Sequence, residues 1–103
     1  MSVMMGLRVS VGDVAKFEEA VNSDPDRLRA IADRAKQAGA IHHRFFANVA
    51  GGEVLVVDEW DSVESFQRFF ENSPDVVEMM GEAGVTSEPV PVFWRELDTL
   101  DKF

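Results

Sequence analysis

The chain has 103 residues, 46% of them hydrophobic and 28% charged, so we expect a single globular domain over residues 1–103. Its 19 acidic and 10 basic side chains give a net charge of −9, which argues against nucleic acid or an anionic membrane as a partner. There is no cysteine, which excludes disulfides and thiolate catalysis. Without a secretory signal or an apolar run of roughly 20 residues, we expect a cytoplasmic protein.

The first part of the chain predicts a strand followed by two helical segments. Residues 3–11 carry an apolar side chain at every second position, which is typical of a half-buried strand. Asp13 is a suitable N-cap for the first helix. Asp24 and Pro25 suit the cap and the first position of the second helix, and Gly39 suits its end.

The middle of the chain predicts a β-hairpin of two strands, residues 40–49 and 54–60. Gly51 and Gly52 tolerate the positive φ angles of a two-residue primed turn, and such a turn fixes the register of the two strands. The cross-strand pairs expected from this turn are His43 with Trp60, Phe45 with Asp58, and Arg44 with Glu59.

The last part of the chain repeats the pattern of the first. Ser62 begins a helix, residues 72–75 interrupt it, and a short apolar segment follows before a final strand over residues 89–97. The order β-α-β-β-α-β predicts an α+β protein of ferredoxin-like plan with a four-stranded antiparallel sheet.

Alternation along the strands divides the sheet into two faces. We expect Val9, Val11, Val90, Val92 and Trp94 to face the helices together with His43, Phe45, Asp58 and Trp60. The other face mixes charged and large apolar groups, and a patch of that kind usually marks a contact surface. We therefore predict a homodimer. The residues expected on its interface are Arg8, Arg44, Phe46, Glu59, Phe93 and Arg95.

The segment from Val56 to Phe66, followed by Phe69-Phe70 and Ser73-Pro74, resembles the strand-to-helix signature of the antibiotic biosynthesis monooxygenase-like proteins, the dimeric α+β barrels. This resemblance implies two ferredoxin-like sheets that form a barrel, with a pocket between sheet and helices in each subunit. It also implies one of several activities, among them oxygenation of polycyclic aromatic compounds without a cofactor and oxidative breakdown of haem. Trp60 matches the tryptophan of the haem-degrading relatives. The first strand lacks their asparagine and residues 63–84 lack their histidine, so the resemblance does not extend to haem degradation.

The candidate catalytic residues are His43 and Asp58. Both are expected on the helix-facing side, with Asp58 diagonal to His43 and within reach of a hydrogen bond. A carboxylate that fixes the imidazole tautomer makes the histidine a usable general base, which oxygenation without a cofactor requires. An internally satisfied pair in a packed core is the structural alternative. The expected walls of the ligand pocket are Phe45, Trp60, Phe66, Phe70 and Trp94.

The basic residues leave two interpretations open. Arg44 forms a cross-strand ion pair with Glu59, or Arg44 or Arg95 binds a substrate carboxylate. No pair of histidines has metal-ligand spacing, so we expect neither a metal nor a cofactor. Three functions remain: a dimer that binds a hydrophobic or aromatic small molecule, a cofactor-independent monooxygenase, and a structural or regulatory dimer without a ligand.

Overall fold

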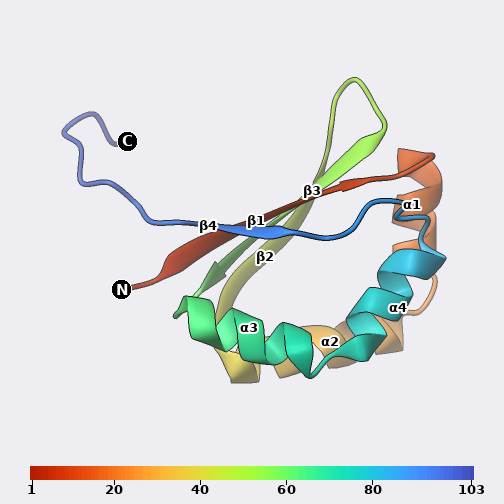
Figure 1. Ribbon diagram of the computed structural model, residues 1–103, viewed down its shortest axis with the longest axis horizontal. Helices are drawn as coiled ribbons and strands as arrows, with labels where there is room; N and C mark the ends of the chain where they lie inside the picture. The colour runs from red at the N-terminus through yellow and green to blue at the C-terminus, as the bar shows by residue number, and fades with distance from the viewer.

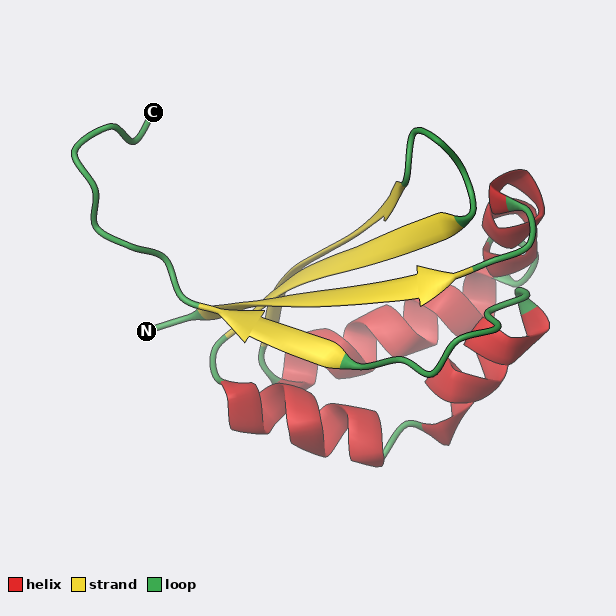
Figure 2. Ribbon diagram, turned by 45° about the horizontal axis from the view of Figure 1, so that its top comes forward, coloured by secondary structure: helices red, strands yellow, loops and turns green.

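The computed structural model describes all 103 residues. Four helices cover one face of a four-stranded sheet and leave the other face uncovered (Figures 1 and 2). The strands are antiparallel in the order β2-β3-β1-β4, which confirms the ferredoxin-like α+β prediction. No helix has the length and apolar character needed to cross a membrane. The elements in chain order are β1 (Val3–Ser10), α1 (Val14–Val21), α2 (Pro25–Ala38), β2 (Ala40–Ala47), β3 (Glu53–Trp60), α3 (Val63–Glu71), α4 (Pro74–Glu82) and β4 (Pro91–Trp94).

Three of the four helices begin at a side-chain cap. Asp13, Asp24 and Ser62 each accept a hydrogen bond from the backbone N–H three residues later, at 3.0–3.1 Å. At the start of α4, Ser73 makes no such bond, because its hydroxyl oxygen accepts from the Arg34 guanidinium of α2 instead. This hydrogen bond connects the start of α4 to α2.

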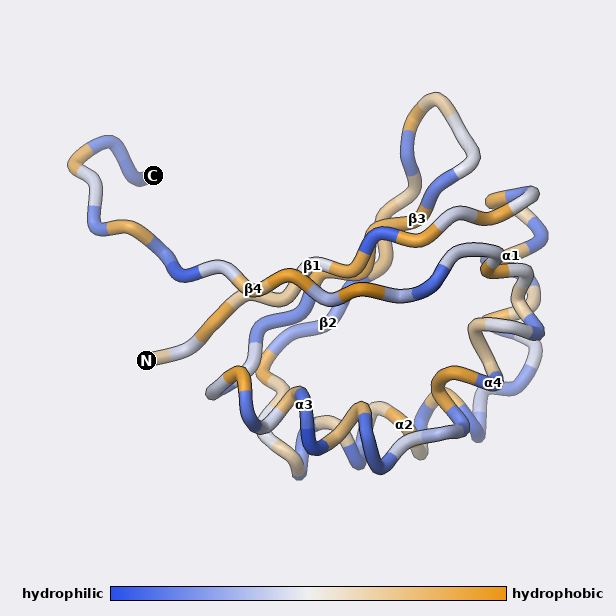
Figure 3. The backbone as a smooth tube through the Cα atoms, in the orientation of Figure 1, coloured by the Kyte–Doolittle hydropathy of each residue, from blue (hydrophilic) through white to orange (hydrophobic).

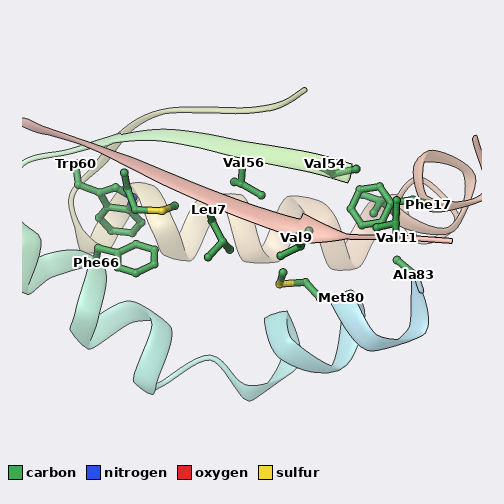
Figure 4. Close-up of a cluster of buried hydrophobic side chains, with 12 residues drawn as sticks. Leu7, Val9, Val11, Phe17, Val54, Val56, Trp60, Phe66, Met80 and Ala83 are labelled. Carbon is green, nitrogen blue, oxygen red and sulfur yellow. The ribbon is translucent and has the colours of Figure 1, made fainter. Parts of the chain in front are cut away.

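The core lies between the inner face of the sheet and helices α1, α3 and α4 (Figure 4). Met5, Leu7 and Val9 of β1 form its centre, which Trp60 of β3 extends toward α3. Hydrophobic residues recur along the strands, whereas many hydrophilic residues lie on the sides of the helices that face away from the sheet (Figure 3). Helix α2 has no buried residue, although its apolar positions follow helical spacing.

The hairpin differs from the predicted one in its turn. The side chain of Asn48 accepts from the Ala50 N–H at 2.9 Å, and the Asn48 carbonyl accepts from the Gly51 N–H at 2.8 Å. The chain therefore turns earlier, and four residues instead of two connect Asn48 to Glu53. Gly51 and Gly52 both keep positive φ angles, 88° and 81°.

This longer loop shifts the register of β2 against β3 by two residues. The predicted pairs were therefore wrong: His43 lies opposite Asp58, Arg44 opposite Val57, and Phe45 opposite Val56. Because a shift of two residues preserves the alternation, each side chain of the hairpin stays on the face expected for it.

The side chains of β4 lie on the opposite faces of the sheet from those predicted. Phe93 lies opposite the buried Met5 and packs against Phe66 with 5.5 Å between ring centroids, so it belongs to the helix-facing side and not to the outer face. Trp94 lies opposite Met4 on the outer face and is 61% exposed. Its indole covers Gly6, where a side chain would meet the Trp94 Nε1 atom at 3.5 Å.

Candidate ligand cavity

A cavity of about 570 Å³ lies between the inner face of the sheet and the helices. Its volume falls within the roughly 300–1,000 Å³ of typical small-molecule sites. Eighteen of its 24 lining residues are hydrophobic, which favours an apolar ligand. The helical lining is Val21 of α1, Leu28, Ile31, Ala32, Ala35 and Lys36 of α2, Phe66, Phe69 and Phe70 of α3, and Val76, Met79 and Met80 of α4.

The cavity exists because α2 packs only in part against the core: Leu28, Ala35 and Ala38 contact it, but no residue of the helix is buried. Its apolar face consists partly of alanines, and Ala32 and Ala35 line the cavity without filling it. Two arginines hold the helix in place against α4. Arg27 pairs with Glu82 at 2.9 Å, and Arg34 pairs with Asp75 at 2.8 Å. Helix α2 therefore forms a wall that is held by these ion pairs together with partial burial.

The Arg34 contact also changes an ionisation equilibrium. The guanidinium hydrogen-bonds to both carboxylate oxygens of Asp75 and lowers the pKa of that carboxyl below its ordinary value. The pair therefore stabilises the fold at pH values above the unfolded pKa of Asp75, and this contribution is lost as the pH falls through the folded value.

Asp58 is the polar centre of the cavity. It is only 7% exposed, and both of its carboxylate oxygens have donors. His43 Nδ1 lies 2.6 Å from Oδ1, and the Trp60 Nε1–H donates to Oδ2 at 3.1 Å. Two donors on one buried carboxylate offset the cost of removing its charge from water.

The predicted pair His43–Asp58 is thus in direct contact and lines the cavity beside Trp60. An ionised Asp58 accepts only, so in the neutral imidazole the proton lies on Nδ1 and the lone pair on Nε2. His43 Nε2 has no hydrogen-bond partner within the chain, and the side chain is 51% exposed. Phe45 contacts the imidazole edge-to-face at 4.9 Å and limits its rotation.

Aromatic rings form one wall of the cavity. Trp60 contacts Phe66 and Phe69 at centroid distances of 5.5 and 5.4 Å, and Phe66 stacks on Phe70 at 5.6 Å. Phe45, Trp60, Phe66 and Phe70 lie where the sequence predicted a ligand pocket. Trp94 does not line the cavity, and its predicted place there was wrong because the phase of β4 was wrong.

Sequence reasoning left Phe69 and Met79 open between cavity lining and ordinary core, and it missed the α2 residues as parts of this lining. Their helical spacing indicates an apolar face in each case, but the same spacing is typical of ordinary core. No group of three or more His, Cys, Asp or Glu side chains is placed to hold a metal ion.

The outer face carries the other residues singled out from the sequence. Arg8 forms a two-pronged contact with Glu53, Phe46 is 49% exposed, and Arg44 is exposed at the edge strand. The predicted Arg44–Glu59 ion pair was wrong: Glu59 accepts from Ser2 and lies 3.9 Å from His42. Arg95 follows the end of β4 and is exposed.

Neither a protein-family model nor a curated protein sequence matches the chain. Several solved structures do. A monooxygenase from the gene ActVA-Orf6 of Streptomyces coelicolor, in complex with nanaomycin D, has a TM-score of 0.71 at 17% identity, over 98% of this chain and 93% of that one. A dimeric ferredoxin-like protein from an uncultured marine organism has a TM-score of 0.69 at 16% identity, over 99% and 93%.

SnoaB, a cofactor-independent oxygenase from Streptomyces nogalater, has a TM-score of 0.66 at 17% identity, over 98% of both chains. Structures of the antibiotic biosynthesis monooxygenase type are among those that share the fold. At this level of identity the likeness establishes the fold alone. The resemblance seen in the sequence is confirmed at that level.

The anchoring of α2 gives a first prediction. We expect Arg34→Ala to lower the free energy of unfolding by about 0.5–1.5 kcal/mol at neutral pH, because Asp75 and the buried Ser73 lose their donor. The difference from the unaltered protein should shrink as the pH falls below about 4, the pKa of Asp75 in the unfolded chain, toward the lower pKa of Asp75 in the folded protein. Urea unfolding at several pH values measures this, and Arg29→Ala, at an exposed pair within α2, is the control. An equal loss at all pH values would contradict the assignment to Asp75.

Proposed function

We propose that this protein is a homodimer that binds a hydrophobic, aromatic small molecule in the cavity beneath its sheet. The observation that carries the proposal is the open cavity of about 570 Å³ with an aromatic wall at Trp60. For a structural dimer without a ligand we would expect a filled core, because an unfilled cavity lowers the stability of the fold. The neighbour from Streptomyces coelicolor, solved with nanaomycin D, supports a ligand of this kind. We also propose that the protein is cytoplasmic, as expected from the sequence.

A cavity-filling pair of variants tests the ligand site. Ala32→Phe adds a ring to the lining, whereas Ala30→Phe adds the same ring to α2 outside it. We expect the first variant to weaken binding of a naphthoquinone by about tenfold or more, because the ligand and the new ring compete for one space. The second variant should bind like the unaltered protein. Quenching of tryptophan fluorescence measures both, and equal binding by the two variants would contradict the cavity as the site.

The uncovered face of the sheet supports the homodimer. Its strands expose large apolar groups that water would otherwise surround. They are Met4 of β1, Phe46 of β2, Leu55 of β3, and Val92 and Trp94 of β4. Beyond β4 the tail runs away from the body of the chain (Figure 2). Leu100 and Phe103 are fully exposed there, and Leu97 is 58% exposed. A second copy of the chain would cover both features, and one neighbour of the same fold is described as dimeric.

Sedimentation equilibrium tests the dimer. We expect the unaltered chain to sediment as a dimer and Trp94→Lys to shift it to a monomer, because a charge buried in an apolar interface is costly to desolvate. Val77→Lys, a similarly exposed apolar position on α4, should leave the dimer unchanged. A monomeric unaltered chain would contradict the proposal.

A second candidate function is oxygenation without a cofactor, which the contact between His43 and Asp58 favours. The free Nε2 of His43 would accept a proton from an acidic C–H of the bound aromatic compound, and Asp58 would stabilise the imidazolium that forms. The substrate carbanion would then add dioxygen to give a peroxide anion. That anion takes a proton and loses water, which leaves a carbonyl group on the ring. The neighbour SnoaB, a cofactor-independent oxygenase, supports this chemistry.

Oxygen uptake with an anthrone as substrate tests the base. We expect His43→Ala to lower turnover by about 10²-fold or more, the usual contribution of a positioned general base. His42→Ala removes an imidazole from the neighbouring position, whose side chain lies toward Glu59 on the other face, and should leave turnover unchanged. Full turnover in His43→Ala would exclude His43 as the base, while ligand binding in the cavity would stand.

A further inference from the structure

We infer that Phe45 determines the length of the ligand, because its ring closes one end of the cavity and separates it from a second hollow. This inference rests on the proposed function, since it concerns which aromatic compounds the same cavity accepts. It follows from the lining of the two spaces, from the contacts of the Phe45 ring, and from the register of the hairpin.

The first step is the second hollow. A space of about 120 Å³ lies next to the cavity, and seven of its nine lining residues are hydrophobic. Phe45, Val21 and Asn22 line both spaces. Phe17 lines only the second hollow, whereas His43 lines only the cavity. The two spaces are therefore neighbours that share a wall.

The second step is the position of Phe45 within this wall. Its ring contacts His43 on the cavity side at a centroid distance of 4.9 Å, and Phe17 on the side of the second hollow at 5.7 Å. Both contacts are edge-to-face, a favourable geometry for aromatic pairs. Phe45 is 37% exposed because β2 is an edge strand, but its ring is held between these two neighbours.

The third step is the direction of the cavity along β3. Trp60 and Val56 line the cavity, and Val54 lines the second hollow. At a rise of about 3.3 Å per residue, Val56 lies about 13 Å from Trp60 along the strand, with Val54 about 7 Å beyond it. Phe45 lies opposite Val56. A rigid ring system that starts at Trp60 and follows β3 therefore meets Phe45 before it reaches the second hollow.

Phe45 also limits the rotation of His43, which is a local role. That role predicts that loss of the ring changes turnover or stability, but not the preference between ligands of different length. Binding measurements therefore separate the two roles.

The test compares naphthoquinone with tetracenequinone, a longer linear ring system, by quenching of tryptophan fluorescence on the full chain. A longer ring system has more apolar surface to bury and would bind more tightly if the cavity had room for its length. We expect the unaltered protein to bind tetracenequinone no more tightly than naphthoquinone. Phe45→Ala should bind tetracenequinone about tenfold more tightly than the unaltered protein does, with no gain for naphthoquinone. Phe45→Val, which keeps a side chain suited to a strand, should behave in the same way.

Two further variants are the controls. Phe70→Ala also removes a ring from the lining of the cavity, but Phe70 does not border the second hollow, so the preference between the two quinones should stay unchanged. Val14 lines the second hollow and not the cavity. Val14→Phe fills that space, so its addition to Phe45→Ala should remove the gain for tetracenequinone.

Tighter binding of tetracenequinone than of naphthoquinone by the unaltered protein would overturn the inference. No gain in either Phe45 variant, or an equal gain in Phe70→Ala, would overturn the assignment to Phe45, while the cavity remains a site for naphthoquinone. A gain that survives the addition of Val14→Phe would overturn the part assigned to the second hollow. Binding of neither quinone to the unaltered protein would overturn this inference and the proposed aromatic site together.

Discussion

A buried carboxylate organises this protein's candidate site. Asp58 points from β3 into the space between sheet and helices, where an unpartnered charge would be costly. Two donors from different places satisfy it: His43 on the neighbouring strand and Trp60 on its own strand. Each of these two hydrogen bonds also positions an aromatic side chain of the site. The first orients an imidazole at the cavity, and the second anchors the indole that joins the core to the aromatic wall.

The cavity depends on a second constraint, the incomplete packing of α2 against the core. A helix normally stays in place by burying an apolar stripe, but α2 buries no residue fully. Its contacts with α4 are Arg27–Glu82 and Arg34–Asp75, and the Arg34 guanidinium also lies 5.8 Å from the centre of the Phe69 ring. Polar anchoring leaves its apolar face available to a ligand. The incomplete burial of α2 would destabilise a protein without a ligand, but it leaves room for a binding site.

The sequence predicted the fold because local signals agreed with one another. The caps at Asp13, Asp24 and Ser62, together with the alternation of the strands, define the elements without tertiary information. The contact between His43 and Asp58 was also predicted, although as a diagonal pair. Its geometry depended on the loop, and the side chain of Asn48 that lengthens this loop is not distinguished by pattern alone.

Other features could not be read from the sequence for physical reasons. In the last strand, Phe93 and Trp94 are both large and apolar, so alternation does not decide which one faces the core. The register of β4 against β1 decides it, with Phe93 opposite the buried Met5, and this register is a tertiary property. The cavity itself was only inferred from the resemblance, because Leu28 and Ala35 have the same spacing whether a helix packs tightly or lines a hollow.

The hydrogen bond between His43 and Asp58 is most directly tested by NMR of the imidazole nitrogens. The geometry predicts that neutral His43 carries its proton on Nδ1, with a downfield proton signal that disappears in Asp58→Asn, and that Nε2 is unprotonated. A neutral imidazole protonated on Nε2, or a proton signal unaffected by Asp58→Asn, would contradict the role assigned to this carboxylate and to the base beside it.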